Sequence, residues 1–326
     1  MNPQDQRRII QWCATLDRTC TIQFYTTEDS RSRPLQQFCD ALQALAPQIR
    51  VVKDEPLNDA LPSIDLGFGI RYRAVPEEKE LAPFLDLLSG VSAPELEAGG
   101  AADTREAKSL LPAHFELFIA PQCPFCPQAV TRLANWTRSL EMMKLTIVDG
   151  MLFDDLARAR KVRSVPMLFL ERDFSWRTMP SWAELEEVMA NRDPARLGPA
   201  ALEDYLSDGR ASGLAALMLA QGVIFPAYLE LLTHSRWPTR LGAMVAFEYI
   251  AEADPALAQG VIEPLCGGFD GLAETVQGDV LQVLATAGGP SVQSFLASVR
   301  DGGYGKEVRT AARETLAEMA ASRGEG

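Results

Sequence analysis

The residues of this chain that could do chemistry are two cysteines in the sequence Cys-Pro-Phe-Cys-Pro, residues 123–127. They follow an apolar run with the spacing of a strand and open a run with the spacing of a helix. Free N–H groups and the positive end of the helix dipole favour a thiolate at a helix start. We therefore expect Cys123 to attack a disulfide and Cys126, one turn deeper, to resolve the mixed disulfide.

The residues between and beside the two cysteines shape the turn. Pro124 is expected at the first helical position, where its missing N–H costs nothing, with Phe125 after it in the redox motif. Pro127 removes another donor from the first turn, so a local bend is expected there.

The same pair could instead be half of a zinc site, or an inert pair. A tetrahedral zinc site needs two more ligands. The chain has no second pair of this spacing, and its only histidines are His114 and His234. The spacing therefore favours redox chemistry without a metal or another cofactor, and the other two interpretations remain as alternatives.

Two more residues are candidates for the same site. Glu116 lies seven residues before Cys123 in an otherwise apolar strand, so we expect it beneath the active-site helix. A carboxyl buried there could exchange a proton with Cys126; the alternative is a strand residue that faces outward. Pro166 directly precedes a predicted strand, a place compatible with a cis peptide bond.

The elements that must position these residues form two similar units. Spacings of three and four predict helices, and alternation predicts strands. The first unit has expected helices at 4–16, 33–45 and 78–88 and strands at 19–25, 49–52 and 70–72. The second has expected strands at 115–119, 145–148 and 167–170 and helices at 124–140, 154–160 and 182–190. A connector rich in Ala, Gly and Glu, residues 92–104, separates the two.

From about residue 199 the pattern predicts only helices. Apolar positions recur after 35 and then 32 residues, in the triplets Leu241, Val245 and Tyr249; Val276, Val280 and Leu284; Val308, Ala312 and Leu316. Such intervals suit stacked helix pairs that bury these rows against one another. They are shorter than the ~40 to 47 residues of HEAT repeats, so we predict HEAT-like repeats, with two irregular helical hairpins as the alternative.

Composition excludes several classes of function. The chain has 326 residues, 47% of them hydrophobic and 23% charged, as globular domains do. A net charge of −13 repels phosphate backbones and anionic lipids, so we expect no nucleic acid partner. The longest uncharged stretch, 211–229, is interrupted by glycine and proline, so no membrane span is expected. With no apolar leader at its start, the protein is expected to be cytoplasmic.

With these features, the second unit resembles the thioredoxin superfamily, in which a strand, a C-x-x-C helix and a distant cis-proline converge. Two tandem units, of which only the second has C-x-x-C, resemble the N-terminal domain of the alkyl hydroperoxide reductase flavoprotein subunit and the archaeal protein disulfide oxidoreductases. The stretches that carry this resemblance are 61–63, 69–72, 75–76, 105–111, 115–116, 123–127, 149–153, 165–166 and Met179.

The resemblance implies a domain order and a set of roles. The expected domains are a thioredoxin-like unit without a redox pair at 1–95, one with it at 105–192, and HEAT-like repeats at 196–326. Cys123 and Cys126 would be catalytic, Glu116 the buried proton carrier and Pro166 the cis-proline. Val165 and Met167 would bind substrate beside it, although the family often has threonine at the position of Met167.

No G-x-G-x-x-G occurs in the chain, so the flavin and nicotinamide machinery of the reductase is missing. Electrons must then come from another protein. The expected function is a cytoplasmic protein dithiol-disulfide oxidoreductase that relays electrons between a flavoprotein disulfide reductase and a protein disulfide, such as that of a peroxiredoxin. The alternative is a protein-interaction scaffold or redox-sensing adaptor built on the helical repeats.

Overall fold

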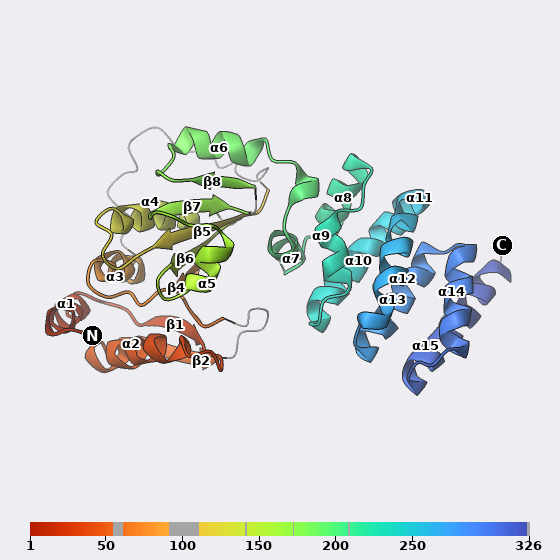
Figure 1. The fold of residues 1–326 in the computed structure, drawn as a ribbon, viewed down its shortest axis with the longest axis horizontal. Helices are drawn as coiled ribbons and strands as arrows, with labels where there is room; N and C mark the ends of the chain where they lie inside the picture. Colours follow the sequence, from red (N-terminus) through yellow and green to blue (C-terminus); the bar gives the residue numbers. More distant parts are fainter. Residues whose placement is uncertain (55–60, 91–110, 141, 172, 208, 325–326) are drawn as a thin grey trace. The chain divides into compact units, whose positions relative to one another are not determined.

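A computed structural model describes residues 1–54, 61–90, 111–140, 142–171, 173–207 and 209–324. The chain divides into two compact units, Met1–Asn191 and Arg192–Gly326 (Figure 1). The predicted connector and the domain bounds at 95 and 105 lie outside the described residues, as do residues 105–110 of the stretch 105–111.

The first unit alternates helices and strands. Its elements are α1 (Pro3–Cys13), β1 (Cys20–Tyr25), α2 (Ser32–Leu45), β2 (Ile49–Asp54), β3 (Ser63–Asp65), β4 (Ile70–Arg73), α3 (Leu81–Ser89), β5 (Ala113–Ile119), α4 (Cys126–Ser139), β6 (Met143–Asp149), α5 (Asp154–Ala159), β7 (Met167–Leu170), β8 (Phe174–Trp176) and α6 (Trp182–Ala190). Every predicted helix and strand in the described part is confirmed in type. The three-residue strands β3 and β8 were not predicted, because so short a run shows no alternation.

The strands form one sheet of eight in the order β2-β1-β3-β4-β6-β5-β7-β8. The two predicted units meet where β4 pairs in parallel with β6, Ile70 opposite Leu145. β5 also runs parallel to β6, β7 runs antiparallel to β5, and β8 runs antiparallel to β7. The two halves of the first unit therefore share one continuous sheet.

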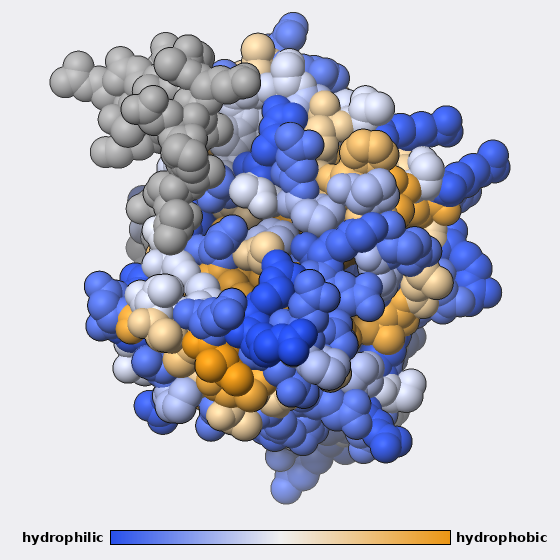
Figure 2. All heavy atoms as spheres, turned by 90° about the vertical axis from the view of Figure 1, so that its left-hand side faces the viewer, coloured by the Kyte–Doolittle hydropathy of each residue, from blue (hydrophilic) through white to orange (hydrophobic). Residues whose placement is uncertain are grey.

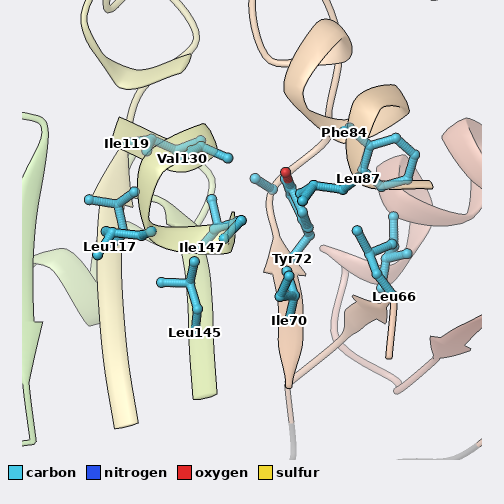
Figure 3. Packing of buried hydrophobic residues seen from close by; sticks show 14 of the residues in the cluster. Leu66, Ile70, Tyr72, Phe84, Leu87, Leu117, Ile119, Val130, Leu145 and Ile147 are labelled. Carbon is cyan, nitrogen blue, oxygen red and sulfur yellow. The ribbon is translucent and has the colours of Figure 1, made fainter. Parts of the chain in front are cut away.

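The two faces of this sheet are covered unequally. Along β5, Phe115, Leu117 and Ile119 belong to the large core that holds side chains of α1, α2, α3, α4 and α6. Phe118 points the other way, into a smaller cluster with Ala157 of α5 and Phe153, the N-cap of that helix. Figure 3 shows the large core between the two halves, where leucine and isoleucine side chains of β4, β5 and β6 lie near one another. The helix that carries the second cysteine thus lies on the face opposite α5.

Helix α3 begins three residues later than the predicted start at residue 78. Glu78 has a positive φ of 55°, a conformation that a right-handed helix excludes. Its N–H donates to Oδ2 of the buried Asp5 at 2.8 Å, which holds this turn against α1. The late start places Glu80 at the N-cap of α3.

The second compact unit, Arg192–Gly326, contains only helices among its described residues. They are α7 (Pro199–Ser207), α8 (Ala211–Gln221), α9 (Pro226–Leu232), α10 (Trp237–Ala253), α11 (Pro255–Ala258), α12 (Ile262–Gly268), α13 (Glu274–Ala287), α14 (Pro290–Asp301) and α15 (Lys306–Gly324), with short 3-10 turns at 194–196, 259–261 and 269–271. Figure 1 shows them following one another in succession, and α10 packs on both α8 and α13. The helical nature of this unit is confirmed, and HEAT-like repeats remain a prediction.

The predicted buried rows hold for α13 and, with Leu316 half-buried, for α15, and fail for α10. Val276, Val280 and Leu284 are buried. On α10 a row of four apolar residues, here called the α10 row, is exposed: Trp237 58%, Leu241 40%, Val245 37% and Tyr249 47%. The helix instead buries its opposite face, which includes Phe247 and Ile250. Because α10 is apolar on both faces, the spacing of its residues cannot tell which face is inside.

The face of the molecule in Figure 2 is mostly hydrophilic, with hydrophobic residues gathered in separate patches. This agrees with the high charge of the chain. Among the described helices, none has the length and apolar character needed to cross a bilayer.

Candidate redox site

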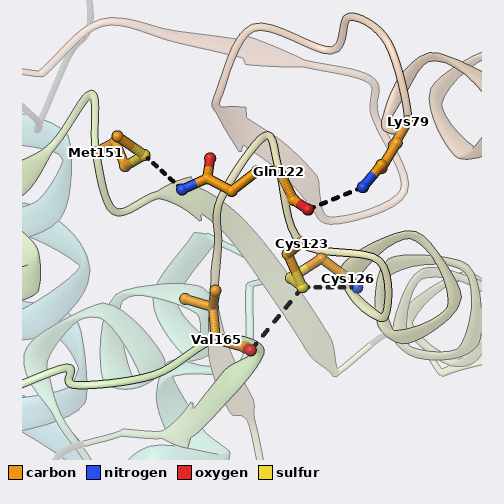
Figure 4. The surroundings of a disulfide bond; sticks show 6 residues. All are labelled: Lys79, Gln122, Cys123, Cys126, Met151 and Val165. Carbon is orange, nitrogen blue, oxygen red and sulfur yellow. Dashed lines mark hydrogen bonds between the residues drawn. A yellow bond between two sulfur atoms is a disulfide. The ribbon is translucent and has the colours of Figure 1, made fainter.

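The two cysteines are joined by a disulfide at the start of α4 (Figure 4). The helix begins at Cys126, two residues later than predicted, so Pro124 lies in the turn before it and Phe125 is the N-cap. Pro127 is then the second helical residue, whose N–H would have no partner within the helix. It therefore costs the helix no hydrogen bond, and the predicted bend is not required.

The sulfur atoms differ in their surroundings. Cys123 is 6% exposed and Cys126 is fully buried. The backbone N–H of Cys126 donates to Sγ of Cys123 at 3.1 Å. A free N–H at a helix start stabilises negative charge on the sulfur that accepts it. The geometry thus supports Cys123 as the attacking thiol and Cys126 as the resolving thiol.

The loop before β7 lies against Cys123. The carbonyl oxygen of Val165 is 3.9 Å from Sγ of Cys123 (Figure 4). The Val165–Pro166 peptide bond is cis, as predicted. Met167 begins β7 and is nearly buried in the smaller cluster. Strand, cysteine pair and cis-proline therefore meet at one place, as the resemblance to the thioredoxin superfamily predicts.

Glu116 does not lie beneath the active-site helix. It shares a face of β5 with Phe118, the face that α5 covers, whereas α4 packs on the other. Its carboxylate forms an ion pair with Arg160, which caps the end of α5, and both side chains are partly exposed. Because β5 is buried on both faces, the apolar residues around Glu116 could not show which way its side chain points. The expected position was wrong.

A different carboxyl lies near the cysteines. β4 and β5 are both parallel to β6, and each is followed by a helix on the same face, α3 and α4, which contact each other. The starts of α3 and α4 are therefore at the same end of the sheet. Lys79 Nζ donates to the carbonyl oxygen of Gln122 at 2.8 Å, directly before Cys123 (Figure 4). This arrangement brings Glu80, the next residue, close to the cysteine turn.

The carboxylate of Glu80 is buried without a hydrogen bond from the described residues to stabilise its charge. The residue is 3% exposed, and neither carboxylate oxygen has a hydrogen-bond partner among the described residues. A cavity of about 160 Å³ is lined by Glu80, by Asp149 and by Pro121, which lies two residues before Cys123. Burial, and then the charge of Asp149, raise the pKa of Glu80 to about 7. A carboxyl with such a pKa can take up and release a proton at neutral pH.

Nothing in the sequence around Glu80 distinguishes it from its neighbours. It ends the run Glu77-Glu78-Lys79-Glu80, which has the composition of a solvated surface turn. Its burial results from α3 packing beside α4, between segments far apart in the chain. The only local sign is its position directly before the apolar run of α3.

The other described cysteines show no comparable site. Cys13 and Cys39 are buried free thiols, and burial raises the pKa of Cys39 to about 12. Among the residues that the structure describes, no group of three or more His, Cys, Asp or Glu side chains could hold a metal ion.

No protein-family model matches this chain, and no curated protein matches it. Among solved structures, the NTD_N/C domain of the alkylhydroperoxide reductase AhpF from Enterococcus faecalis is 20% identical and aligns over 58% of this chain and 100% of its own, with a TM-score of 0.49. A protein disulfide oxidoreductase from Aeropyrum pernix is 16% identical over 58% of this chain and 92% of its own, with a TM-score of 0.47. Such similarity concerns the fold and does not extend to activity.

Proposed function

We propose that the protein is a dithiol-disulfide oxidoreductase built on two tandem thioredoxin-like units, of which the second carries the redox pair. The observation that carries the proposal is the cysteine pair itself. A nearly buried sulfur accepts an N–H at a helix start, faces the Val165–Pro166 loop, and is backed by a fully buried second sulfur.

In the proposed reaction, the thiolate of Cys123 attacks one sulfur of a protein disulfide and the other sulfur leaves as a thiolate. Cys126 then loses its proton, for which Glu80 is the acceptor we propose, and attacks Sγ of Cys123. The Cys123–Cys126 disulfide forms, and the substrate leaves with both of its sulfurs reduced. Two electrons have passed from the protein to the substrate.

A second protein must restore the reduced pair. The donor we propose is a flavoprotein disulfide reductase, and the acceptor is a disulfide-bearing protein such as a peroxiredoxin, in the cytoplasm. The helical unit, residues 196–326, is proposed to be HEAT-like.

Insulin reduction tests this function. With dithiothreitol as the electron source, we expect the protein to reduce many insulin molecules per active site, because each turnover regenerates the pair. The rate is followed as turbidity from the released insulin chain, with a protein lacking both sulfurs, Cys123→Ser/Cys126→Ser, as the control. A rate equal to that control would exclude the proposed activity.

The α10 row favours a second candidate function, binding of a partner protein by the helical unit. A contiguous exposed apolar surface commonly marks an interaction site. Its occupant would be a basic amphipathic helix, because Glu248 and Glu252 are exposed on the same helix. The two arginines at its start are already paired, Arg236 with Glu203 and Arg240 with Asp279.

A pair of designed peptides tests this second candidate. We expect the full chain to bind a labelled helical peptide of leucine and lysine, measured by fluorescence anisotropy, and to bind its leucine–glutamate counterpart far more weakly. The double variant Leu241→Ser/Val245→Ser should weaken binding about tenfold through lost apolar contact. Ala216→Ser, at an exposed position of α8, is the matched control. Equal binding of both peptides, or unchanged binding by the double variant, would exclude this surface.

A further inference from the structure

Two large apolar side chains stand exposed beside the reactive sulfur. Phe125, between the cysteines, is 68% exposed, and Met151, in the loop after β6, is 63% exposed. Figure 4 shows Met151 next to Gln122, the residue that precedes Cys123. Exposed apolar surface at a reactive group is costly to leave in water and is suited to contact with a partner.

Met151 is exposed but held in place from two sides. Its backbone N–H donates to Oδ1 of Asp149 at 2.8 Å, and Asp149 is itself buried. The side-chain amide of Gln122 donates to Sδ of Met151 at 3.2 Å. Because these contacts exist before a substrate arrives, less conformational entropy is lost when an apolar group packs on the thioether.

The loop on the other side of Cys123 is basic. Lys161 and Arg163 are exposed, and no ion pair holds either of them among the described residues. By contrast, the nearby Arg158 is paired with Asp154. Arg163 lies two residues before Val165, whose carbonyl oxygen is 3.9 Å from Sγ of Cys123. In a chain of net charge −13, unpaired cations at this place favour an acidic partner.

We propose that the site selects disulfides whose attacked cysteine lies between a large apolar residue and an acidic residue. The apolar residue packs on Met151 and Phe125, and the acidic residue pairs with Arg163. This substrate class rests on the oxidoreductase function proposed above. The thiolate of Cys123 bonds to the sulfur of the flanked cysteine, and the second sulfur of that disulfide leaves as a thiolate and takes its proton from water.

Short peptides with a single cysteine, joined by a disulfide to 5-thio-2-nitrobenzoate, test the proposal with the full chain. The coloured thiolate is the leaving group, so its release reports attack on the peptide sulfur. Three peptides suffice. They contain Leu-Cys-Glu, Ser-Cys-Glu or Leu-Cys-Lys and have the same uncharged residues elsewhere. With the protein reduced beforehand and freed of reductant, we expect the second-order rate constant of attack to be about tenfold higher for the first than for the second, the size that apolar pockets achieve. The rate for Leu-Cys-Glu should exceed that for Leu-Cys-Lys by about two- to fivefold, the contribution of an exposed ion pair.

Variants assign these preferences to residues. Met151→Ser should bring the ratio of the rates for the Leu-Cys-Glu and Ser-Cys-Glu peptides close to one. Met151→Leu should restore this ratio. Arg163→Glu should reverse the preference between glutamate and lysine. Ile10→Ser and Arg177→Glu alter exposed residues elsewhere and should leave both ratios unchanged. Each ratio is measured within one variant, so a general loss of activity does not affect it.

The outcomes separate this proposal from the function on which it rests. Equal rate constants for all three peptides, or a leucine preference that survives in Met151→Ser, would overturn the proposed substrate class alone. Failure to reduce any peptide, together with failure to reduce insulin, would overturn both.

Discussion

Cys123→Ser abolishes disulfide reduction, whereas Cys126→Ser still attacks substrate and remains attached to it as a mixed disulfide. This is the expected result because, of the two sulfurs of the pair, only that of Cys123 is partly exposed, while Cys126 is fully buried and donates its N–H to the Cys123 sulfur. Without Cys126, no second thiol can release the bound substrate. Mass spectrometry after mixing each variant with oxidised insulin should find the adduct only for Cys126→Ser.

Alkylation of the reduced protein at neutral pH, followed by peptide mapping, checks the same assignment independently. Cys123 should be labelled first. Cys266→Ser is the matched control, since burial raises the pKa of that thiol and it should contribute nothing to turnover. Preferential labelling of Cys126, or an adduct on Cys123→Ser, would reverse the roles of the two cysteines.

Glu80→Gln should slow disulfide exchange by about 10² at neutral pH, the lower end of what a positioned proton carrier contributes. It should also flatten the pH dependence of the rate near pH 7, where Glu80 titrates. Stopped-flow measurement of insulin reduction between pH 5 and pH 9 gives both quantities. Glu116→Gln is the matched control, because it removes a carboxyl from the opposite face of the sheet. It should lose at most about 1 kcal/mol of stability with its ion pair and keep the rate.

The stability of Glu80→Gln gives a second readout with a defined sign. The folded protein holds the pKa of Glu80 near 7, above its ordinary value of 4.5. The unfolded state then binds fewer protons between these values, so stability falls as pH rises from about 4.5 through 7. At pH 8 the variant should be more stable by up to about 3 kcal/mol, less the cost of a buried amide, and below pH 4 only that cost should remain. A rate slowed by Glu116→Gln but not by Glu80→Gln would restore the first assignment of the proton carrier.

The sequence predicts well those features that are local in the chain. The cysteine pair, the cis bond before β7 and most helices depend on spacings within a few residues. Features that depend on the packing of distant segments are missed. Glu116 and the α10 row show one cause: β5 and α10 are apolar on two sides, and periodicity does not tell which side meets which neighbour. Glu80 shows another, since its burial comes from helices that lie side by side but are separated in sequence.

The pairing of β4 with β6 has a consequence for how the protein avoids aggregation. Split between its two halves, the sheet would expose β4 and β6 as open edges, each ready to add a strand from another molecule. Joined, the sheet keeps only the edges at β2 and β8. β8 is only three residues long, and β2 ends in the exposed charges of Lys53 and Asp54. Short and charged edges discourage strand addition. The half without the redox pair therefore covers an edge of the redox half that could otherwise add a strand from another molecule.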